Sequence, residues 1–543
     1  MPHCTRRNIL AAGLGAVAAA RFAWADDSDE LFALTLQQAS ERIHAGKLSP
    51  VDLTQACLDR IGVYNPKTNA WITVMREKAL AQAKALADEQ AAGRFRSPLH
   101  GIPIGIKDTI DTVGVRTTAA SAVYENRFPA EDAEVVRRLK AAGAVLIGKC
   151  NMHEFDAGAN SAVSYWGPVR NPWNLERVPG GASGGSAAAV AMENCFASLG
   201  TDSNGDIRLP AAFCGVVGLK PTYGRVSLRG IVPFAWSLDH CGPIARTVQD
   251  AAMVLQQIAG YDPQDIDSLD RPVPDYAAAF HLPVSSMRLG IAPQFYDHLD
   301  DEVSRAIDDA IAVLNKLTQG SHEVSLPSLL KTGGVLAEIA AYHEDLHPVN
   351  GGGYEPASTR VFSQGQDAKA VDYIKSWREL ELIRRTVNEE VFETQKVSLL
   401  IAPSARHLPA TVEECLVPAG AGGRGEGGAS AAAAAGGGSG RGGRGGGTGG
   451  APGGAARGQI DPQEDTRPFN GYGLPVITVP CGFSKDGMPI GLQIAGPRFG
   501  EAAVLALANA YEQATEWHKR RPPLRPDTKV PTLSKAAAEQ TGS

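Results

Sequence analysis

Short apolar runs alternate with longer amphipathic stretches along most of this chain. The apolar runs predict β-strands at Ile102–Ile106, Ala144–Ile147, Arg288–Ala292, Leu399–Ala402, Pro475–Val479 and Ile490–Ile494. The amphipathic stretches predict helices at Val51–Val63, Ile72–Ala92, Ala133–Ala142, Val248–Ala259, Asp301–Leu317, Asp372–Gln395 and Glu501–Thr515. Strands that alternate with helices favour an α/β domain, in which helices cover both faces of a mixed, twisted sheet.

The amino-acid composition is that of a soluble globular protein. Of the 543 residues, 43% are hydrophobic and 20% are charged. The formal net charge is −7, so we expect neither a nucleic-acid partner nor a membrane partner for the mature chain. This length supports a large core, which we place in one domain over residues 26–530, with a disordered tail over residues 531–543.

The N-terminal residues resemble an export signal. Arg6 and Arg7 precede a weakly apolar run, Ala11–Ala20, and the pattern A-x-A follows at Ala23–Ala25. Residues 1–25 are therefore predicted to be a twin-arginine signal peptide, and the mature chain is expected in the periplasm. The other interpretation is a basic start to a cytoplasmic helix.

Residues 418–458 differ abruptly in composition from the rest of the chain. About half of them are glycine, and almost none has a side chain that could be buried, so ordering them would cost more entropy than it gains. We predict a flexible insertion within the domain, because strand-like sequence resumes at Pro475. Arg424, Arg441 and Arg444 resemble an RGG-type RNA-binding segment, but three arginines favour a solvated linker.

The eight cysteines are scattered along the chain. None forms a C-x-x-C pair, so neither a zinc site nor thioredoxin-like chemistry is indicated. We expect most of them to be small buried hydrophobic residues.

Three segments between Gly101 and Arg246 carry the candidate chemistry. Pro179–Ser186 is a Gly/Ser loop that opens an Ala-rich helix, where free backbone N–H groups suit an anion or an oxyanion. A second loop follows at Gly200–Pro210, and a lone lysine ends the predicted strand in Gly101–Asp108. Together the three segments are much more specific than any one of them.

The chain resembles the amidase signature family from about Leu31 to about Leu524. The resemblance is carried by Pro98–Asp108, Pro179–Ser186, Gly200–Thr222, Ser237–Pro243 and Tyr511–His518. It implies the mixed-sheet fold of that family, no metal or organic cofactor, and hydrolysis of linear amides through an acyl-enzyme. In that mechanism a neutral lysine takes a proton from a serine in a cis peptide bond, which relays it from the nucleophilic serine. Four successive backbone N–H groups stabilise the oxyanion.

The motif match assigns each of these roles to a position in this chain. Lys107 is the lysine, and the oxyanion-hole stretch is Ser203, Asn204, Gly205 and Asp206. The nucleophilic serine falls on Asp206, and the relay serine falls on Ala182. Asp206 is a poor replacement, because its attack on an amide would form a high-energy anhydride. Ser183 and Ser186 remain in the first loop, but neither occupies the relay position.

We hypothesise that an ion pair between Lys107 and Asp206 replaces the triad. Ala182 is smaller than serine, which clears space through which Asp206 would reach the lysine. A carboxylate about 4 Å from an ammonium group gains roughly 4 kcal/mol at an effective dielectric constant of 20, which would keep the lysine charged. The competing interpretation is that Ser183 or Ser203 has become the nucleophile, with a shifted oxyanion geometry.

Other polar residues near the loops have structural interpretations. Asp202 and Arg208 are expected to pair and to fix the shape of the second loop, and Asp239 is expected to lie in a supporting loop. The large aromatic residues that either line a substrate channel or pack in the core are Trp166, Phe234 and Trp236.

Two classes of function remain. The first is an exported amidase whose activity is weak or repositioned. The second is a non-catalytic relative that binds a small-molecule ligand or a partner in the amidase cleft. The residues at positions 182 and 206 favour loss of ordinary triad hydrolysis, and the sequence assigns neither a substrate nor an oligomeric state.

Overall fold

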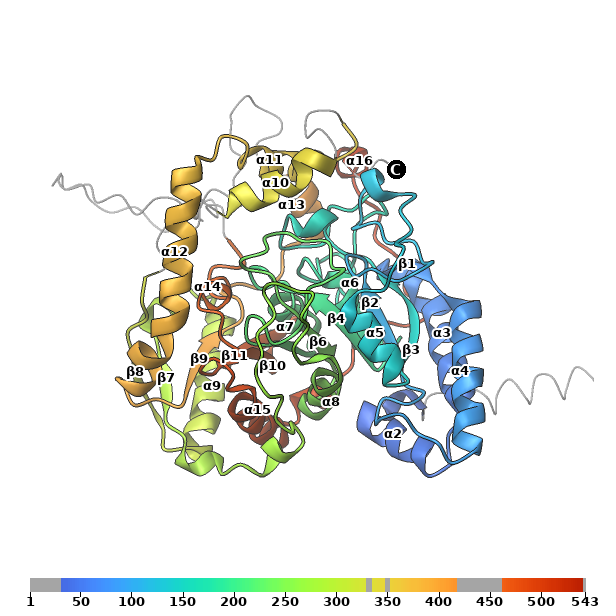
Figure 1. Ribbon diagram of the computed structural model, residues 1–543, viewed down its shortest axis with the longest axis horizontal. Helices are drawn as coiled ribbons and strands as arrows, with labels where there is room; N and C mark the ends of the chain where they lie inside the picture. The colour runs from blue at the N-terminus through green and yellow to red at the C-terminus, as the bar shows by residue number, and fades with distance from the viewer. Residues whose placement is uncertain (1–30, 329–334, 347–351, 418–460, 541–543) are drawn as a thin grey trace, which may run out of the picture.

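The structure, a computed structural model, describes residues 31–328, 335–346, 352–417 and 461–540 (Figure 1). The predicted signal peptide, residues 1–25, and the predicted Gly/Ala-rich insertion, residues 418–458, lie outside these described ranges. None of the described helices is both long and apolar enough to cross a membrane.

One mixed sheet of eleven strands runs through the centre of the molecule (Figure 1). Its strands are β1 Trp71–Val74, β2 Pro103–Lys107, β3 Val145–Cys150, β4 Ala197–Thr201, β5 Val217–Lys220, β6 Cys241–Ala245, β7 Leu289–Ile291, β8 Ser321–Glu323, β9 Leu399–Pro403, β10 Val476–Phe483 and β11 Pro489–Ala495. Their order is β1-β3-β2-β4-β6-β5-β10-β11-β9-β7-β8. Strand β2 pairs in parallel with β3 and β4, and β7 pairs in parallel with β8 and β9, whereas the other pairs are antiparallel.

Helices cover both faces of the sheet, as the sequence predicts. They are α2 Leu36–His44, α3 Pro50–Thr68, α4 Arg76–Ala91, α5 Glu134–Ala141, α6 Gly184–Ala191, α7 Arg208–Cys214, α8 Val248–Ile258, α9 Asp301–Leu317, α10 Leu336–Leu346, α11 Pro356–Ser363, α12 Ala370–Val387, α13 Val412–Leu416, α14 Pro468–Gly471, α15 Glu501–Thr515 and α16 Lys535–Glu539. On β11, Gly491 and Gln493 face α7, while α8, α9 and α15 pack together against the opposite face. Every residue of β2, β3 and β4 is buried between these layers.

The predicted strands and helices are all present, with one boundary corrected. The expected helix Ile72–Ala92 begins as strand β1, which pairs with β3, and only Arg76–Ala91 is helical. The sheet needs an edge partner for β3, and this tertiary pairing overrides the local helical pattern. The strands that the sequence did not reveal, β4, β5 and β6, contain glycine, proline or lysine and lack a long apolar run.

The prediction of a disordered tail is wrong for residues 535–539, which form α16. Ser534 caps this helix by accepting a hydrogen bond from Ala537 N at 3.3 Å. Ala537 is fully buried against a small apolar cluster that includes Val412 and Leu416. A short segment therefore gains its order from a tertiary contact that composition does not reveal.

The sheet places the candidate residues at one edge. Lys107 ends β2 and Thr201 ends the neighbouring parallel strand β4, so the two side chains lie at the same end of the sheet. The chain continues from Thr201 through a loop into α7, which packs against α6. The Gly/Ser loop ahead of α6 and the loop ahead of α7 therefore meet beside Lys107.

Candidate functional site

Lys107 is completely buried and is held by two polar side chains. Its Nζ donates to Thr201 Oγ1 at 2.6 Å and forms an ion pair with Asp156 Oδ1. Among the ion pairs of the described residues there is none between Lys107 and Asp206. The hypothesis of a Lys107–Asp206 pair is therefore wrong, because a carboxylate from another part of the chain has taken the lysine.

Asp156 reaches the lysine from a short 3₁₀ turn, Glu154–Asp156, that follows β3. Its backbone has a positive φ of 61°, an uncommon conformation for a residue other than glycine. Its Oδ2 accepts a hydrogen bond from Thr201 Oγ1 at 2.9 Å. Asp156, Thr201 and Lys107 thus form a closed, buried hydrogen-bonded cluster at the end of β2 and β4.

The Asp206 carboxylate binds backbone N–H groups instead of the lysine. Its Oδ2 accepts hydrogen bonds from Ser203 N at 2.9 Å and from Asn204 N at 3.1 Å. Its Oδ1 accepts from Ala182 N at 2.9 Å and from Gln463 Nε2 at 2.8 Å. Four N–H donors therefore surround one carboxylate, which is the hydrogen-bonding pattern that an ionised carboxylate prefers.

The predicted oxyanion-hole N–H groups are largely occupied by the protein itself. Ser203 and Asn204 donate to Asp206, and Gly205 N donates to Asp202 Oδ1 at 2.8 Å. The backbone at Gly205 has a φ of +132°, and a Cβ there would lie 2.0 Å from Thr466 Oγ1. Only glycine fits at this position, because the turn that carries Gln463 and Thr466 packs directly over the loop.

The Gly/Ser loop ahead of α6 is also closed by internal hydrogen bonds. The Gly181–Ala182 peptide bond is cis, at the position where the family resemblance implies a cis serine. Ser183 Oγ donates to Thr201 O at 3.0 Å, and Ser186 Oγ donates to Leu199 O at 3.1 Å. Both hydroxyl groups are fully buried and bond to strand β4.

Asp202 and Arg208 pair as the sequence predicts. Arg208 Nε lies 3.0 Å from Asp202 Oδ2, and both side chains are fully buried. Arg208 also donates to Gln493 Oε1 at 2.8 Å, and Asn470 Nδ2 donates to Asp202 Oδ1 at 2.8 Å. Although burial opposes it, Arg208 holds the pKa of Asp202 well below its usual range.

The electrostatic balance of the site leaves Asp206 as its least compensated charge. Lys107 is paired with Asp156, and Arg208 is paired with Asp202. Burial and then the negative charge of Asp202 raise the pKa of Asp206, while Lys107 and the N–H group of Ser203 act in the opposite direction. Two cations therefore serve three carboxylates.

Ser203 connects this loop to the supporting loop that contains Asp239. Ser203 Oγ donates to Asp239 Oδ1 at 2.6 Å, and the same carboxylate accepts from Phe234 N and Ala235 N. Burial raises the pKa of Asp239 to about 7. Asp239 thus supports the loop as expected, and it also places a carboxylate beside the hydroxyl of Ser203.

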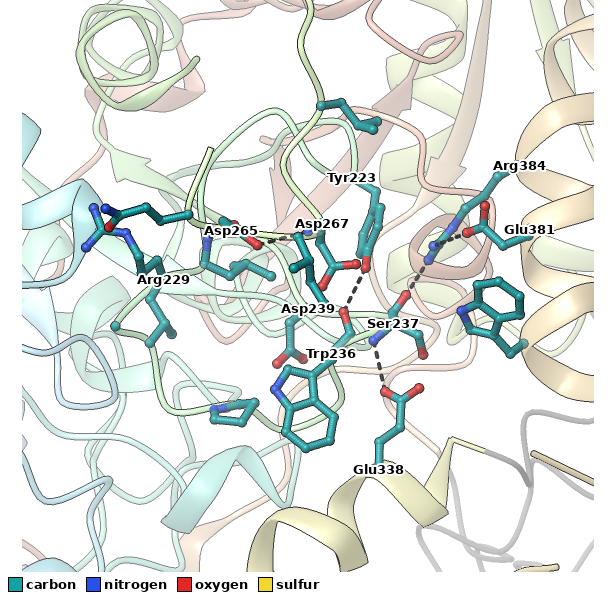
Figure 2. A pocket seen from close by; sticks show the side chains of 18 of the residues that line it. Tyr223, Arg229, Trp236, Ser237, Asp239, Asp265, Asp267, Glu338, Glu381 and Arg384 are labelled. Atoms are coloured by element: carbon teal, nitrogen blue, oxygen red, sulfur yellow. Dashed lines mark hydrogen bonds and ion pairs between the residues drawn. The ribbon is translucent and has the colours of Figure 1, made fainter. Parts of the chain in front are cut away.

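A cavity of about 730 Å³, called here the Trp236 cavity, lies on the other side of Asp239 (Figure 2). Its walls come from the loops around Tyr223, Trp236 and Asp267 and from helices α10 and α12. Trp236 and Trp377 are 43% and 47% exposed at this cavity. Of the aromatic residues named from the sequence, Trp236 lines the cavity, while Trp166 donates from Nε1 to Thr118 Oγ1 at 3.1 Å.

Internal hydrogen bonds hold the rim of the Trp236 cavity in place (Figure 2). Tyr223 Oη donates to Trp236 O at 2.9 Å, and Ser237 N donates to Glu338 Oε2 at 2.9 Å. Arg384 donates to Ser237 O and pairs with Glu381 at 3.3 Å. The cavity is therefore preformed, with carboxylates, arginines and aromatic rings on its walls.

Three residues of the site escape sequence reasoning. Thr201 and Asp156 hold Lys107, and Gln463 completes the shell of donors around Asp206. Thr201 ends a strand beside the lysine strand, so its position follows once β4 is recognised. Asp156 and Gln463 lie in irregular turns, and no periodic pattern marks them.

Metal ligation gains no support from the geometry. In the described part of the chain, no three His, Cys, Asp or Glu side chains come together in a way that could hold a metal ion. The described cysteines are all unpaired, and six of the seven are buried, as expected for small hydrophobic residues.

A family model of amidases matches residues 52–416 and 456–505, so this chain belongs to the amidase family. The A subunit of glutamyl-tRNA(Gln) amidotransferase from Roseiflexus sp. (strain RS-1) is 40% identical over 528 residues, which cover 91% of this chain and 99% of the relative. The solved 6-aminohexanoate cyclic dimer hydrolase in complex with substrate matches with a TM-score of 0.77 and 28% identity, over 91% of this chain and 99% of that one.

The solved A-type chain of glutamyl-tRNA(Gln) amidotransferase from Thermotoga maritima matches with a TM-score of 0.67 and 30% identity. This match covers 89% of this chain and 95% of that chain. The chain therefore has the amidase signature fold over nearly its whole described length, so the substitutions at positions 182 and 206 lie within an otherwise complete amidase framework.

Proposed function

We propose that this amidase-family protein does not hydrolyse amides by the serine mechanism of its family and instead binds a small-molecule ligand in its cleft. The observation that carries this proposal is the seat of the Asp206 carboxylate among Ser203 N, Asn204 N and Ala182 N. N–H groups that already bind a carboxylate are not free to stabilise an oxyanion.

Two further features support the proposal. Position 206 provides no hydroxyl, and Ala182 provides none for a proton relay. Lys107 is held in an ion pair with Asp156, so it has no free lone pair with which to act as a base. Each of the three steps of the family mechanism, attack, relay and deprotonation, therefore lacks its group.

The ligand site that we propose is the Trp236 cavity. Its volume of about 730 Å³ is within the range typical of small-molecule sites. It reaches the candidate loop through Asp239, and its exposed tryptophans offer apolar contact area. A ligand there would lie beside the old catalytic loop without needing its chemistry.

Labelling with a serine-directed fluorophosphonate, followed by peptide mapping, tests this proposal. We expect no labelled serine in the wild-type protein and no turnover of simple aryl or aliphatic amides. A labelled serine together with amide turnover would overturn the proposal.

A second candidate function is amide hydrolysis with Ser203 as the nucleophile. The contact that favours it is the 2.6 Å hydrogen bond from Ser203 Oγ to Asp239, because a carboxylate beside a hydroxyl can act as its base. Labelling confined to Ser203, and lost in Ser203→Ala, would support this candidate. The occupied N–H groups of the loop argue against it.

We also propose export by the twin-arginine route, which rests on the sequence around Arg6 and Arg7. The test compares the location of the wild-type precursor with that of a variant in which both arginines are lysine. Export of the wild-type protein and retention of the variant would support the proposal, whereas identical cytoplasmic location of both would overturn it.

A further inference from the structure

A second cavity, of about 510 Å³, has an unusual concentration of positive charge. It lies between the loop that contains Arg271 and the start of the segment before α15. Its walls include Arg225, Arg271, Arg498, Asn388 and Phe499. We call it the arginine pocket, and it is separate from the loop that contains Asp206.

The three guanidinium groups gather around one aromatic ring. Their Cζ atoms lie 4.7 Å (Arg225), 5.7 Å (Arg271) and 5.7 Å (Arg498) from the centre of the Phe499 ring. All three are therefore within about 6 Å of a single point, the range of a cation–π contact. The ring offsets part of their charge, but it does not satisfy their N–H groups.

The acidic residues nearby do not balance this charge. Arg225 Nε lies 3.6 Å from Glu501 Oε1, while the next charges, Arg384 and Glu381, pair with each other at 3.3 Å. Among the described residues, neither Arg271 nor Arg498 forms an ion pair. Three cations and one carboxylate leave an excess of two positive charges.

The hydrogen-bond inventory also shows unused donors. Arg225 is 3% exposed and its Nη1 donates to Arg271 O and Pro272 O, yet its Nε has no hydrogen-bond partner. Arg498 Nη1 donates to Arg384 O at 3.0 Å, but its buried Nε has no partner either. The Arg271 side chain has no hydrogen bond among the described residues. Buried donors of this kind are normally satisfied by a partner.

We propose that the arginine pocket binds a doubly charged oxyanion, either inorganic phosphate or the phosphate group of a small phosphate monoester. A dianion neutralises the excess of two positive charges. The planar forks of guanidinium groups match the oxygen geometry of phosphate. Arg498 also lines the Trp236 cavity, so the two cavities share one residue at their boundary.

Isothermal titration calorimetry on the full chain at constant ionic strength tests this site. The titrants are inorganic phosphate, glycerol 2-phosphate, sulfate and acetate. We expect saturable one-site binding of phosphate and sulfate, and binding of acetate at least about tenfold weaker, because acetate carries one charge instead of two. Tighter binding of glycerol 2-phosphate than of inorganic phosphate identifies the monoester as the better ligand, and equal binding identifies the free anion.

Arg271→Ala is the decisive variant, because Arg271 is exposed and its loss leaves the fold intact. It should weaken phosphate binding about tenfold or more, the effect of losing a hydrogen bond to a charged group. Arg305→Ala is the matched control, since Arg305 lines another cavity of about 520 Å³ in which Lys485, Glu302 and Asp309 balance the charge. Asp206→Ser should also leave phosphate binding unchanged.

Two outcomes would overturn the proposal. One is the absence of saturable phosphate binding to the wild-type protein. The other is equal phosphate affinity in the wild type and in Arg271→Ala, which would place any bound anion elsewhere.

Discussion

The Lys107 ammonium group pairs with Asp156, a residue that the chain brings in from a turn 49 positions further along. This pair frees Asp206 from the lysine, and the Asp206 carboxylate binds the N–H groups of its own loop and of the Gly/Ser loop. One cluster therefore holds the base of the family mechanism, and a second fills the place of the oxyanion.

Restoring the two hydroxyl groups should not by itself restore amidase activity. We expect the double variant Ala182→Ser with Asp206→Ser to turn over simple amides slowly, because Asp156 still holds Lys107 in its charged form. Adding Asp156→Ala removes that partner and lets burial favour the neutral lysine. The triple variant should then exceed the double variant by about 100-fold in kcat/KM, within the range that a general base contributes.

The control for this comparison is Asp156→Ala alone, which should remain inactive because it provides no nucleophile. Thermal unfolding confirms that each variant is folded. Equal activity of the double and triple variants would show that Asp156 does not suppress the lysine.

The Asp206→Asn variant tests whether the carboxylate is ionised in its nest of donors. An amide nitrogen would face N–H groups that now donate to an oxygen, and at least Ala182 N would lose its acceptor. We expect a loss of about 2 kcal/mol in the free energy of unfolding, measured by urea denaturation.

The matched control is Asp59→Asn, which breaks an exposed pair with Arg76 and should cost less than about 1 kcal/mol. If Asp206→Asn is as stable as the wild type, the Asp206 side chain is protonated in the native state and the four donors do not define its charge.

Arg208 should be essential to the stability of the loop. It is fully buried, it pairs with Asp202, and it donates to Gln493. Arg208→Met would leave the Asp202 carboxylate buried without a cation, at a cost of about 3–5 kcal/mol. A loss below about 1 kcal/mol in urea denaturation, as expected for the exposed pair Lys84–Asp88, would contradict this role.

Glu512 gives a prediction for the pH dependence of stability. Burial raises its pKa to about 8, and its Oε2 accepts a hydrogen bond from Val248 N at 3.0 Å. The folded state therefore binds more protons than the unfolded state between the ordinary pKa of glutamate, about 4.3, and about 8. Stability from this group is present at low pH and is lost as the pH rises through that window.

The Glu512→Gln variant removes this titration and keeps an acceptor for Val248 N. Relative to the wild type, the variant should gain about 2–4 kcal/mol in the free energy of unfolding between pH 5 and pH 8.5. Urea denaturation of both proteins at the two pH values measures the difference. Parallel loss of stability in the two proteins would show that Glu512 does not titrate in this range.

The sequence predicted the framework of the site better than its contacts. Lys107 and the two loops were located because a strand end and Gly/Ser-rich segments have recognisable patterns. The Asp202–Arg208 pair was also predicted, because both residues flank the same loop. The ion pair of Lys107 was predicted with the wrong partner.

The reason for this error is physical. Asp156 lies in an irregular turn with a positive φ, and Gln463 follows the Gly/Ala-rich segment far along the chain. Neither position has a periodicity that marks it as part of the site. A choice between two carboxylates for one lysine depends on the tertiary packing of distant turns, and local sequence does not encode it legibly.

The most direct measurement of the central claim is the release of ammonia from simple aliphatic amides by the wild-type protein and by Lys107→Ala. If the Asp206 carboxylate occupies the N–H groups that would bind the oxyanion, both proteins should give no release above the buffer rate. Turnover by the wild-type protein that disappears in Lys107→Ala would contradict the account.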